Sequence, residues 1–258
     1  MRKVFGRVKS RRILWPICLS VFVACGLPVA AERATPKIVC RAAFAPARRQ
    51  ELAEQLRAIT GWPGLHFDGD GVLRFGEAQP TGGSQTARSL LASAQAGENL
   101  IIIEDASGSA DVAFCRVLEG RWKSGADGRP RAFVLQIDFA DFSHVMGDGE
   151  ARASFNAGWG VMHEIDHVVR GSVDPDGPGA AGECEELINR MRRECGLAER
   201  AEYFYTPVPG AEPSAFKTRF VRLAFERAQA QSKRRRYWLL WDAEIVGGTP
   251  AAGQVAAR

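Results

Sequence analysis

The sequence predicts an α+β protein, in which helices pack on a small mixed sheet and two strands form a hairpin near the C-terminal end. Three observations predict this class. Hydrophobic residues make up 46% of the 258 residues, which is enough for a buried core. Apolar residues recur at helical spacing in four segments, and short β-rich runs lie between and after those segments.

The first half of the chain contains two of the predicted helices. Residues 47–60 have Leu52, Leu56 and Ile59 at helical spacing, and the glycines and proline of residues 61–64 end that helix. Residues 65–75, LHFDGDGVLRF, predict a hairpin. The alternative, a calcium-binding loop, is disfavoured because the segment lacks the spaced ligands and the terminal glutamate of such loops. We further expect a helix at 86–96 and strands at 100–104, 112–117 and 133–139.

The second half contains the other two helices. The glycine-rich loop of residues 147–149 leads into a helix that starts near Ser154 and ends at Gly171. A turn-rich loop follows, and then a helix at 183–195 with an apolar stripe. Strands at 216–225 and 236–246 form the C-terminal hairpin. The basic run of residues 233–236 is interpreted as its solvated tip, with a partner-binding patch as the alternative.

The N-terminus has the pattern of a secretion signal. Six basic residues lie within the first twelve, an apolar stretch runs from Ile13 to about Pro28, and small residues precede a cleavage point near Ala31. We therefore expect a signal peptide at 1–31, a single domain at 32–258, and a periplasmic or secreted location. Ser10-Arg11-Arg12 also resembles a twin-arginine signal, and a lipoprotein anchor at Cys25 is the further alternative.

The charge of the chain excludes some partners. The formal net charge is +4, but without residues 1–31 there remain 28 basic and 30 acidic residues. A domain close to neutrality offers no basic face for nucleic acid. The apolar N-terminal stretch is short for a membrane span, so we expect no integral span in the processed chain. The oligomeric state does not follow from the sequence.

Four cysteines lie outside the predicted signal: Cys40, Cys115, Cys184 and Cys195. An even number in an oxidising compartment favours two disulfides. If residues 183–195 are helical, Cys184 and Cys195 lie about 16 Å apart along the axis, too far for a bond between them. Either the helix is therefore linked to Cys40 and Cys115, or some thiols stay free.

The residues that carry chemistry form the motif His163-Glu164-Ile165-Asp166-His167, which fits HExxH. Residues four apart on a helix project from one face, so both imidazoles can bind one metal ion. Glu164 is offset on the same helix, where it can act as general base on a water molecule activated by zinc. The motif predicts one Zn²⁺ held by His163 and His167, although manganese or cobalt could occupy the same site.

A third protein ligand is needed. The pattern of metzincins, with glycine three and histidine six residues after the second histidine, is absent. A glutamate on the following helix, as in gluzincins, is the alternative. Glu183 is the first choice because it lies one turn before Leu187 and so should face inward. Asp174 is the second choice, and Glu186 and Glu185 are the further alternatives. Acidic residues that merely favour the helix dipole explain these side chains equally well.

Two further side chains near the motif have open roles. Asp166 either orients a histidine or faces water. His144 is interpreted as a surface histidine, with stabilisation of an oxyanion as the alternative.

Asn189 to Tyr203, NRMRRECGLAERAEY, is similar to the N-x-x-R-x-E-x-G-L-P-x-R-x-x-Y segment of a bacterial group of HExxH zinc metallopeptidases related to type III secreted effectors. The resemblance spans roughly residues 45–206, and Ala198 replaces the usual proline. It implies metal ligands at His163 and His167 and a catalytic base at Glu164. Arg200 and Tyr203 are interpreted as packing and hydrogen-bonding residues, with Tyr203 as an oxyanion donor the alternative.

The motif predicts a zincin-like fold and zinc-dependent hydrolysis of peptide bonds in an exported protein or peptide. Two alternatives stay open. The first is a non-catalytic exported protein whose zinc serves stability or whose hairpin binds a partner. The second is hydrolysis of another amide, such as that of cell-wall peptide.

Overall fold

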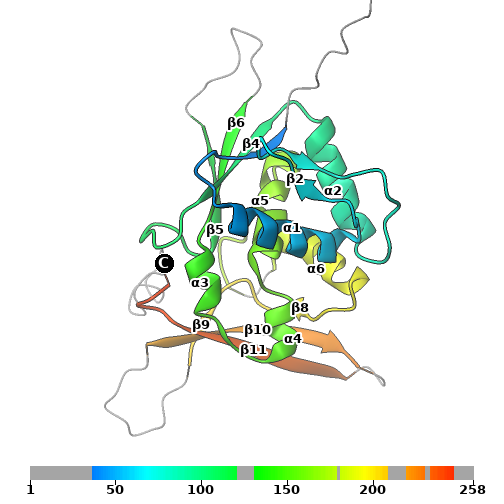
Figure 1. Ribbon diagram of the computed structural model, residues 1–258. Coiled ribbons are helices and arrows are strands. Elements are labelled where there is room, and N and C mark those ends of the chain that lie inside the picture. Colours follow the sequence, from blue (N-terminus) through cyan, green and yellow to red (C-terminus); the bar gives the residue numbers. More distant parts are fainter. Residues whose placement is uncertain (1–36, 121–130, 179–180, 209–218, 230–232, 247–258) are drawn as a thin grey trace, which may run out of the picture. The chain divides into compact units, whose positions relative to one another are not determined.

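The computed structural model describes residues 37–120, 131–178, 181–208, 219–229 and 233–246. The predicted signal, its cleavage point and the two alternative export signals lie outside these residues. All described residues belong to one unit that extends from Thr35 to Arg258. Their arrangement confirms the α+β class, and Figure 1 shows helices and several sheets in this unit.

A four-stranded mixed sheet forms the first part of the fold. Its strands are β1 (Ile38–Cys40), β4 (Leu100–Asp105), β5 (Cys115–Glu119) and β6 (Ala132–Ile137), in the order β1-β4-β6-β5. The strands β1, β4 and β6 run parallel, whereas β5 pairs antiparallel with β6 and forms one edge. The isoleucine-rich β4 lies in the interior of this sheet, as expected for an apolar run with two neighbours.

Helix α5 (Ala157–Arg170) is the central helix of this part. It contacts β5 and β6 of the sheet and three helices, α1 (Pro46–Thr60), α2 (Gln85–Ala96) and α6 (Gly182–Glu194). In Figure 1 these helices lie on the same side of β4, β5 and β6. One hydrophobic core joins the helices to the sheet, and Trp159, Met162 and Ile165 of α5 are buried in it. The motif residues are therefore held by a helix that packs on five other elements.

A second sheet follows near the C-terminal end. It contains β7 (Met146–Gly147), β8 (Glu199–Arg200), β9 (Thr206–Pro207), β10 (Phe220–Ala228) and β11 (Arg234–Asp242). The strands β10 and β11 pair antiparallel over nine residues each, which confirms the predicted hairpin with strand bounds shifted by two to four residues. Its apolar face forms a separate core around Val221, Leu223, Phe225 and Trp241. The predicted C-terminal hairpin is thus the centre of a sheet of its own, and with the β2–β3 pair the described residues form three sheets.

The remaining elements are short. The strands β2 (His66–Phe67) and β3 (Leu73–Arg74) confirm the hairpin around the Asp68 turn. Helices α3 (Phe139–Ser143) and α4 (Gly149–Ala153) precede α5 and did not follow from the sequence pattern. Among the described residues, none of the helices combines the length and apolar character needed to cross a bilayer.

Phe114 connects the two cores at the start of the edge strand. Its φ of 62° is unusual for a bulky residue, and its ring lies 5.2 Å from that of Phe142 and 5.3 Å from that of Trp241. The backbone N–H of Phe114 donates to the carboxylate of Asp141 at 3.0 Å, and its carbonyl accepts from Asp138. Because these contacts bend the chain here, β5 begins at Cys115, three residues later than predicted.

Candidate metal centre

Helix α5 begins and ends at capping residues that set the position of the motif. The side chain of Asn156 accepts a hydrogen bond from the backbone N–H of Trp159, so α5 starts at Ala157 rather than near Ser154. Gly171 ends the helix in the left-handed conformation, with φ 67°. His163 and His167 lie one turn apart, and their ring centroids are 4.8 Å apart.

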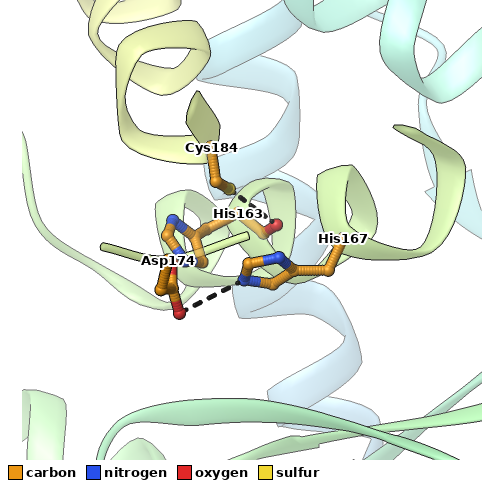
Figure 2. A group of neighbouring side chains, drawn as sticks. All are labelled: His163, His167, Asp174 and Cys184. Carbon is orange, nitrogen blue, oxygen red and sulfur yellow. Dashed lines mark hydrogen bonds and ion pairs between the residues drawn. The ribbon is translucent and has the colours of Figure 1, made fainter. Parts of the chain in front are cut away.

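The turn at Gly171 returns the chain along α5 and brings Asp174 to both imidazoles. Nε2 of His163 lies 3.1 Å from Oδ1 of Asp174, and Nε2 of His167 lies 3.5 Å from Oδ2. Figure 2 shows the Asp174 side chain beside the two rings. Asp174, the second choice for the third ligand in the sequence analysis, therefore contacts both predicted histidine ligands.

The other nitrogen of each ring faces an acceptor. Nδ1 of His167 lies 2.7 Å from the backbone carbonyl of Ser172, which can only accept a hydrogen bond, so Nδ1 carries the proton. Nδ1 of His163 lies 3.5 Å from a carboxylate oxygen of Glu185. When both rings are neutral and protonated on Nδ1, each Nε2 atom has a lone pair, and both lone pairs face the Asp174 carboxylate. Outer partners of this kind orient metal-ligating histidines in proteins.

The charges at this place also favour a cation. Burial opposes protonation of His163, but contacts with Asp174, Cys184 and Glu185 outweigh it and raise its pKa well above the usual value. The hydrogen bond with Asp174 likewise raises the pKa of His167. Burial works against ionisation of Asp174, yet both histidines lower its pKa. Two imidazoles and one carboxylate are a donor set that zinc binds.

Glu164 lies beside this group without joining it. Its carboxyl is buried, and burial raises its pKa against the opposing effect of the two histidines. The backbone of Val117, in edge strand β5, lies near Glu164 and acts to lower its pKa. A carboxylate whose pKa moves toward neutrality suits a general base. Glu164 thus lies close enough to both histidines for their charges to act on its carboxyl.

Cys184 approaches the same group from the start of α6. Its thiol is fully buried and donates a hydrogen bond to the backbone carbonyl of His163 at 3.3 Å. One possible ligand atom from each of His163, His167, Asp174 and Cys184 lies within 4.8 Å of the others. Burial raises the pKa of Cys184 to about 12, while His163 lowers it. Figure 2 shows Cys184 on the side of His163 opposite to Asp174.

Tyr203 closes the group from the segment that follows α6. Its side chain lies close enough to Asp174 for each to shift the pKa of the other, and its ring is inclined by 29° to that of His163, with 6.2 Å between centroids. The guanidinium of Arg200 lies 4.6 Å from the centroid of the Tyr203 ring. The residues interpreted as packing elements therefore contact the site residues directly.

The predicted inward orientation of Glu183 is wrong. Glu183 and Glu186 are exposed at the start of α6, whereas Glu185 is buried. The inward face of this helix contains Cys184, Glu185, Ile188, Asn189, Met191 and Arg192. Three of these residues, Glu185, Asn189 and Arg192, are polar. These three can be buried because Arg192 donates hydrogen bonds to the other two. An apolar stripe alone does not reveal such a face.

Asp166 and His144 are not part of the group. Asp166 is fully buried; one of its oxygens lies 3.3 Å from Arg170, and the other has no hydrogen-bond partner in the described part of the chain. His144 is exposed at the end of α3, in agreement with its interpretation as a surface histidine.

The four cysteines Cys40, Cys115, Cys184 and Cys195 are free thiols, so the favoured disulfides are absent. Cys40 and Cys115 lie in β1 and β5, at opposite edges of a sheet in which β4 and β6 separate them. Three strand spacings amount to about 14 Å, so these two cysteines are also too far apart to bond to each other. Cys195 instead contacts the backbone carbonyl of Ile59.

The segment Asn189–Tyr203 has defined partners in the structure. Asn189 exchanges two hydrogen bonds with the backbone of Arg200, and Arg192 donates to Glu185, Asn189 and the carbonyl of Ser154. Gly196 ends α6 with φ 69°. No role for Arg192 followed from the sequence. The pattern that could have indicated one is its helical spacing from Glu185 and Asn189, which places the three side chains on one face of α6.

Comparisons with protein-family models, with curated proteins and with solved structures gave no significant match.

Proposed function

We propose that this protein is a zinc-dependent peptidase in which His163, His167 and Asp174 hold the metal and Glu164 is the general base. The observation that carries the proposal is the convergence of both Nε2 atoms on Asp174, at 3.1 and 3.5 Å. Three protein ligands leave a coordination position open, as catalytic zinc requires. Zincin-like architecture is part of the proposal, because an HExxH helix packs beside the antiparallel edge strand of a mixed sheet.

The reaction assigns a separate task to each residue. When bound, zinc would polarise the scissile carbonyl and acidify a water molecule. Glu164 accepts a proton from the attacking water and passes it to the leaving amine. Its buried position and raised pKa suit both transfers. Tyr203 holds Asp174 in place, and the Ser172 carbonyl and Glu185 hold the two imidazoles.

The substrate we propose is an extended peptide, from an exported protein or peptide. Among the strands that the structure describes, β5 pairs only with β6, and Val117 of β5 lies near Glu164. Unpaired backbone groups on an edge strand can bind an extended chain by adding it to the sheet. Such a peptide would pass directly over the candidate centre.

The test is the conservative substitution Glu164→Gln, assayed on a peptide library with zinc-loaded protein. We expect kcat/KM to fall by about 10²–10⁴-fold, because the base is lost, while zinc content stays at one ion per chain. The matched control is Glu54→Gln, which changes an exposed helix carboxylate of α1. Equal cleavage by the Glu164→Gln variant and the parent would exclude this mechanism.

A zinc site that serves stability alone is the second candidate, and Cys184 favours it. If Cys184 also bound the metal, four protein ligands would close the site. Cobalt substitution separates the two, because a thiolate ligand adds an intense near-ultraviolet charge-transfer band. The catalytic proposal predicts no such band and unchanged metal content in a Cys184→Ser variant.

A further inference from the structure

Glu185 lies behind His163, on the side of the ring away from Asp174. It is 1% exposed, and its Oε2 lies 3.5 Å from Nδ1 of His163 and 3.2 Å from Nη1 of Arg200. Its Oε1 accepts a hydrogen bond from Arg192, whose side chain is also buried. One carboxylate therefore contacts a candidate metal ligand and two guanidinium groups.

These contacts hold Glu185 in place, because Arg192 and Arg200 each set a positive charge against the buried carboxylate. Arg192 is itself fixed by Asn189, by the Ser154 carbonyl and by the ring of Trp159, 5.3 Å from its guanidinium. Both oxygens of Glu185 are occupied, so this side chain is not available as the third metal ligand.

Arg200 extends the same network to the other side of the centre. It donates to the carbonyl oxygens of Glu202 and Tyr203, and its guanidinium stacks on the Tyr203 ring. Tyr203 in turn contacts both Asp174 and the ring of His163. Arg200 and Tyr203 therefore form a chain of contacts from the Glu185 carboxylate to Asp174.

We infer that Glu185, clamped by Arg192 and Arg200, is a positioning residue for the metal centre. It orients His163 directly and Asp174 through Arg200 and Tyr203. The inference rests on the proposed function, since it requires a metal at His163, His167 and Asp174. Ligands that are oriented before the metal arrives bind it more tightly, because less order must be imposed on binding.

The test is the zinc affinity of two Glu185 variants of the purified protein, measured by competition with a chromophoric chelator. Glu185→Gln keeps the shape and removes the charge, whereas Glu185→Asp keeps the charge and withdraws it from His163. We expect zinc affinity to fall by about 10–100-fold in both variants. Should Glu185→Gln fail to fold with two unpaired arginines, the Glu185→Asp variant decides.

Glu194→Gln is the matched control. Glu194 lies on the same helix and makes three hydrogen bonds, to Ser84 and Thr86 of the α2 start, but none to the site. We expect zinc affinity and the cobalt d–d spectrum to be unchanged in this variant, and the spectrum to change in Glu185→Asp. A merely structural role of Glu185 would alter stability without altering that spectrum.

The outcomes separate the two proposals. If the parent protein binds no zinc, the proposed function fails, and this inference fails with it. If the parent binds zinc and the folded Glu185 variants bind it with the same affinity and spectrum, the inference alone is overturned.

Discussion

The two ends of helix α6 carry similar side chains with different surroundings. At the N-terminal end, Glu185 and Cys184 are buried, and both contact His163. At the C-terminal end, Glu194 is exposed and bonds to the first turn of α2, while Cys195 contacts α1. One helix thus joins the candidate centre to the helical layer. Burial and partner, not residue type, determine which task each carboxylate has.

The largest effect is expected from Arg192→Met at the site end. Arg192 is 2% exposed, and its loss leaves Glu185 buried with one counter-charge fewer. Breaking a buried ion pair lowers the free energy of unfolding by about 3–5 kcal/mol. Urea unfolding measures this loss, and we expect zinc affinity to fall as well. A loss below about 1 kcal/mol would mean that the buried charges at this end contribute no more than surface pairs.

Asn189→Ala tests how far the site end extends along α6. The Asn189 side chain satisfies the backbone N–H and carbonyl of Arg200, and its own position is buried. Unpaired buried groups lower stability by about 1–3 kcal/mol. Because Arg200 would also move, we expect weaker zinc binding in the same variant. Normal zinc affinity with reduced stability would place Asn189 among the purely structural residues.

The smallest effect is expected from Glu194→Gln at the other end. The glutamine keeps one acceptor oxygen but loses the charge, so the bonds from Ser84 and Thr86 weaken and stability falls by about 0.5–1.5 kcal/mol at neutral pH. Burial opposes ionisation of Glu194, but the hydrogen bonds from Ser84 and Thr86 outweigh it and lower its pKa. The stabilisation is therefore present above the ordinary carboxyl pKa and is lost as pH falls through the lowered value. Unfolding curves of parent and variant should converge in acid; a difference that persists there would exclude the ionised carboxylate as its source.

Much of the fold could be predicted because periodic apolar residues mark helices that pack on one core. Helices α1, α2 and α6 begin and end within one residue of their predicted bounds. Shifts occur where a single residue overrides the pattern. Asn156 moves the start of α5, and the positive φ of Phe114 moves the start of β5.

The site was predictable in its local part only. His163, Glu164 and His167 follow from spacing on one helix, which the structure contains. The position of Asp174 depends on the turn at Gly171, where the chain reverses after α5. The periodicity of the helix does not predict that reversal. The inward face of α6 was misassigned because Glu185, Asn189 and Arg192 are buried as a mutually bonded polar set, while Glu183 is exposed.

The most direct test of the central claim is zinc content and affinity in Asp174→Ala beside Glu183→Ala. We predict one zinc ion per chain in the parent and in Glu183→Ala, because Glu183 is exposed outside the group. We predict a large loss of zinc affinity in Asp174→Ala, since two imidazoles alone would remain. Zinc bound normally without Asp174, and lost without Glu183, would contradict the centre described here.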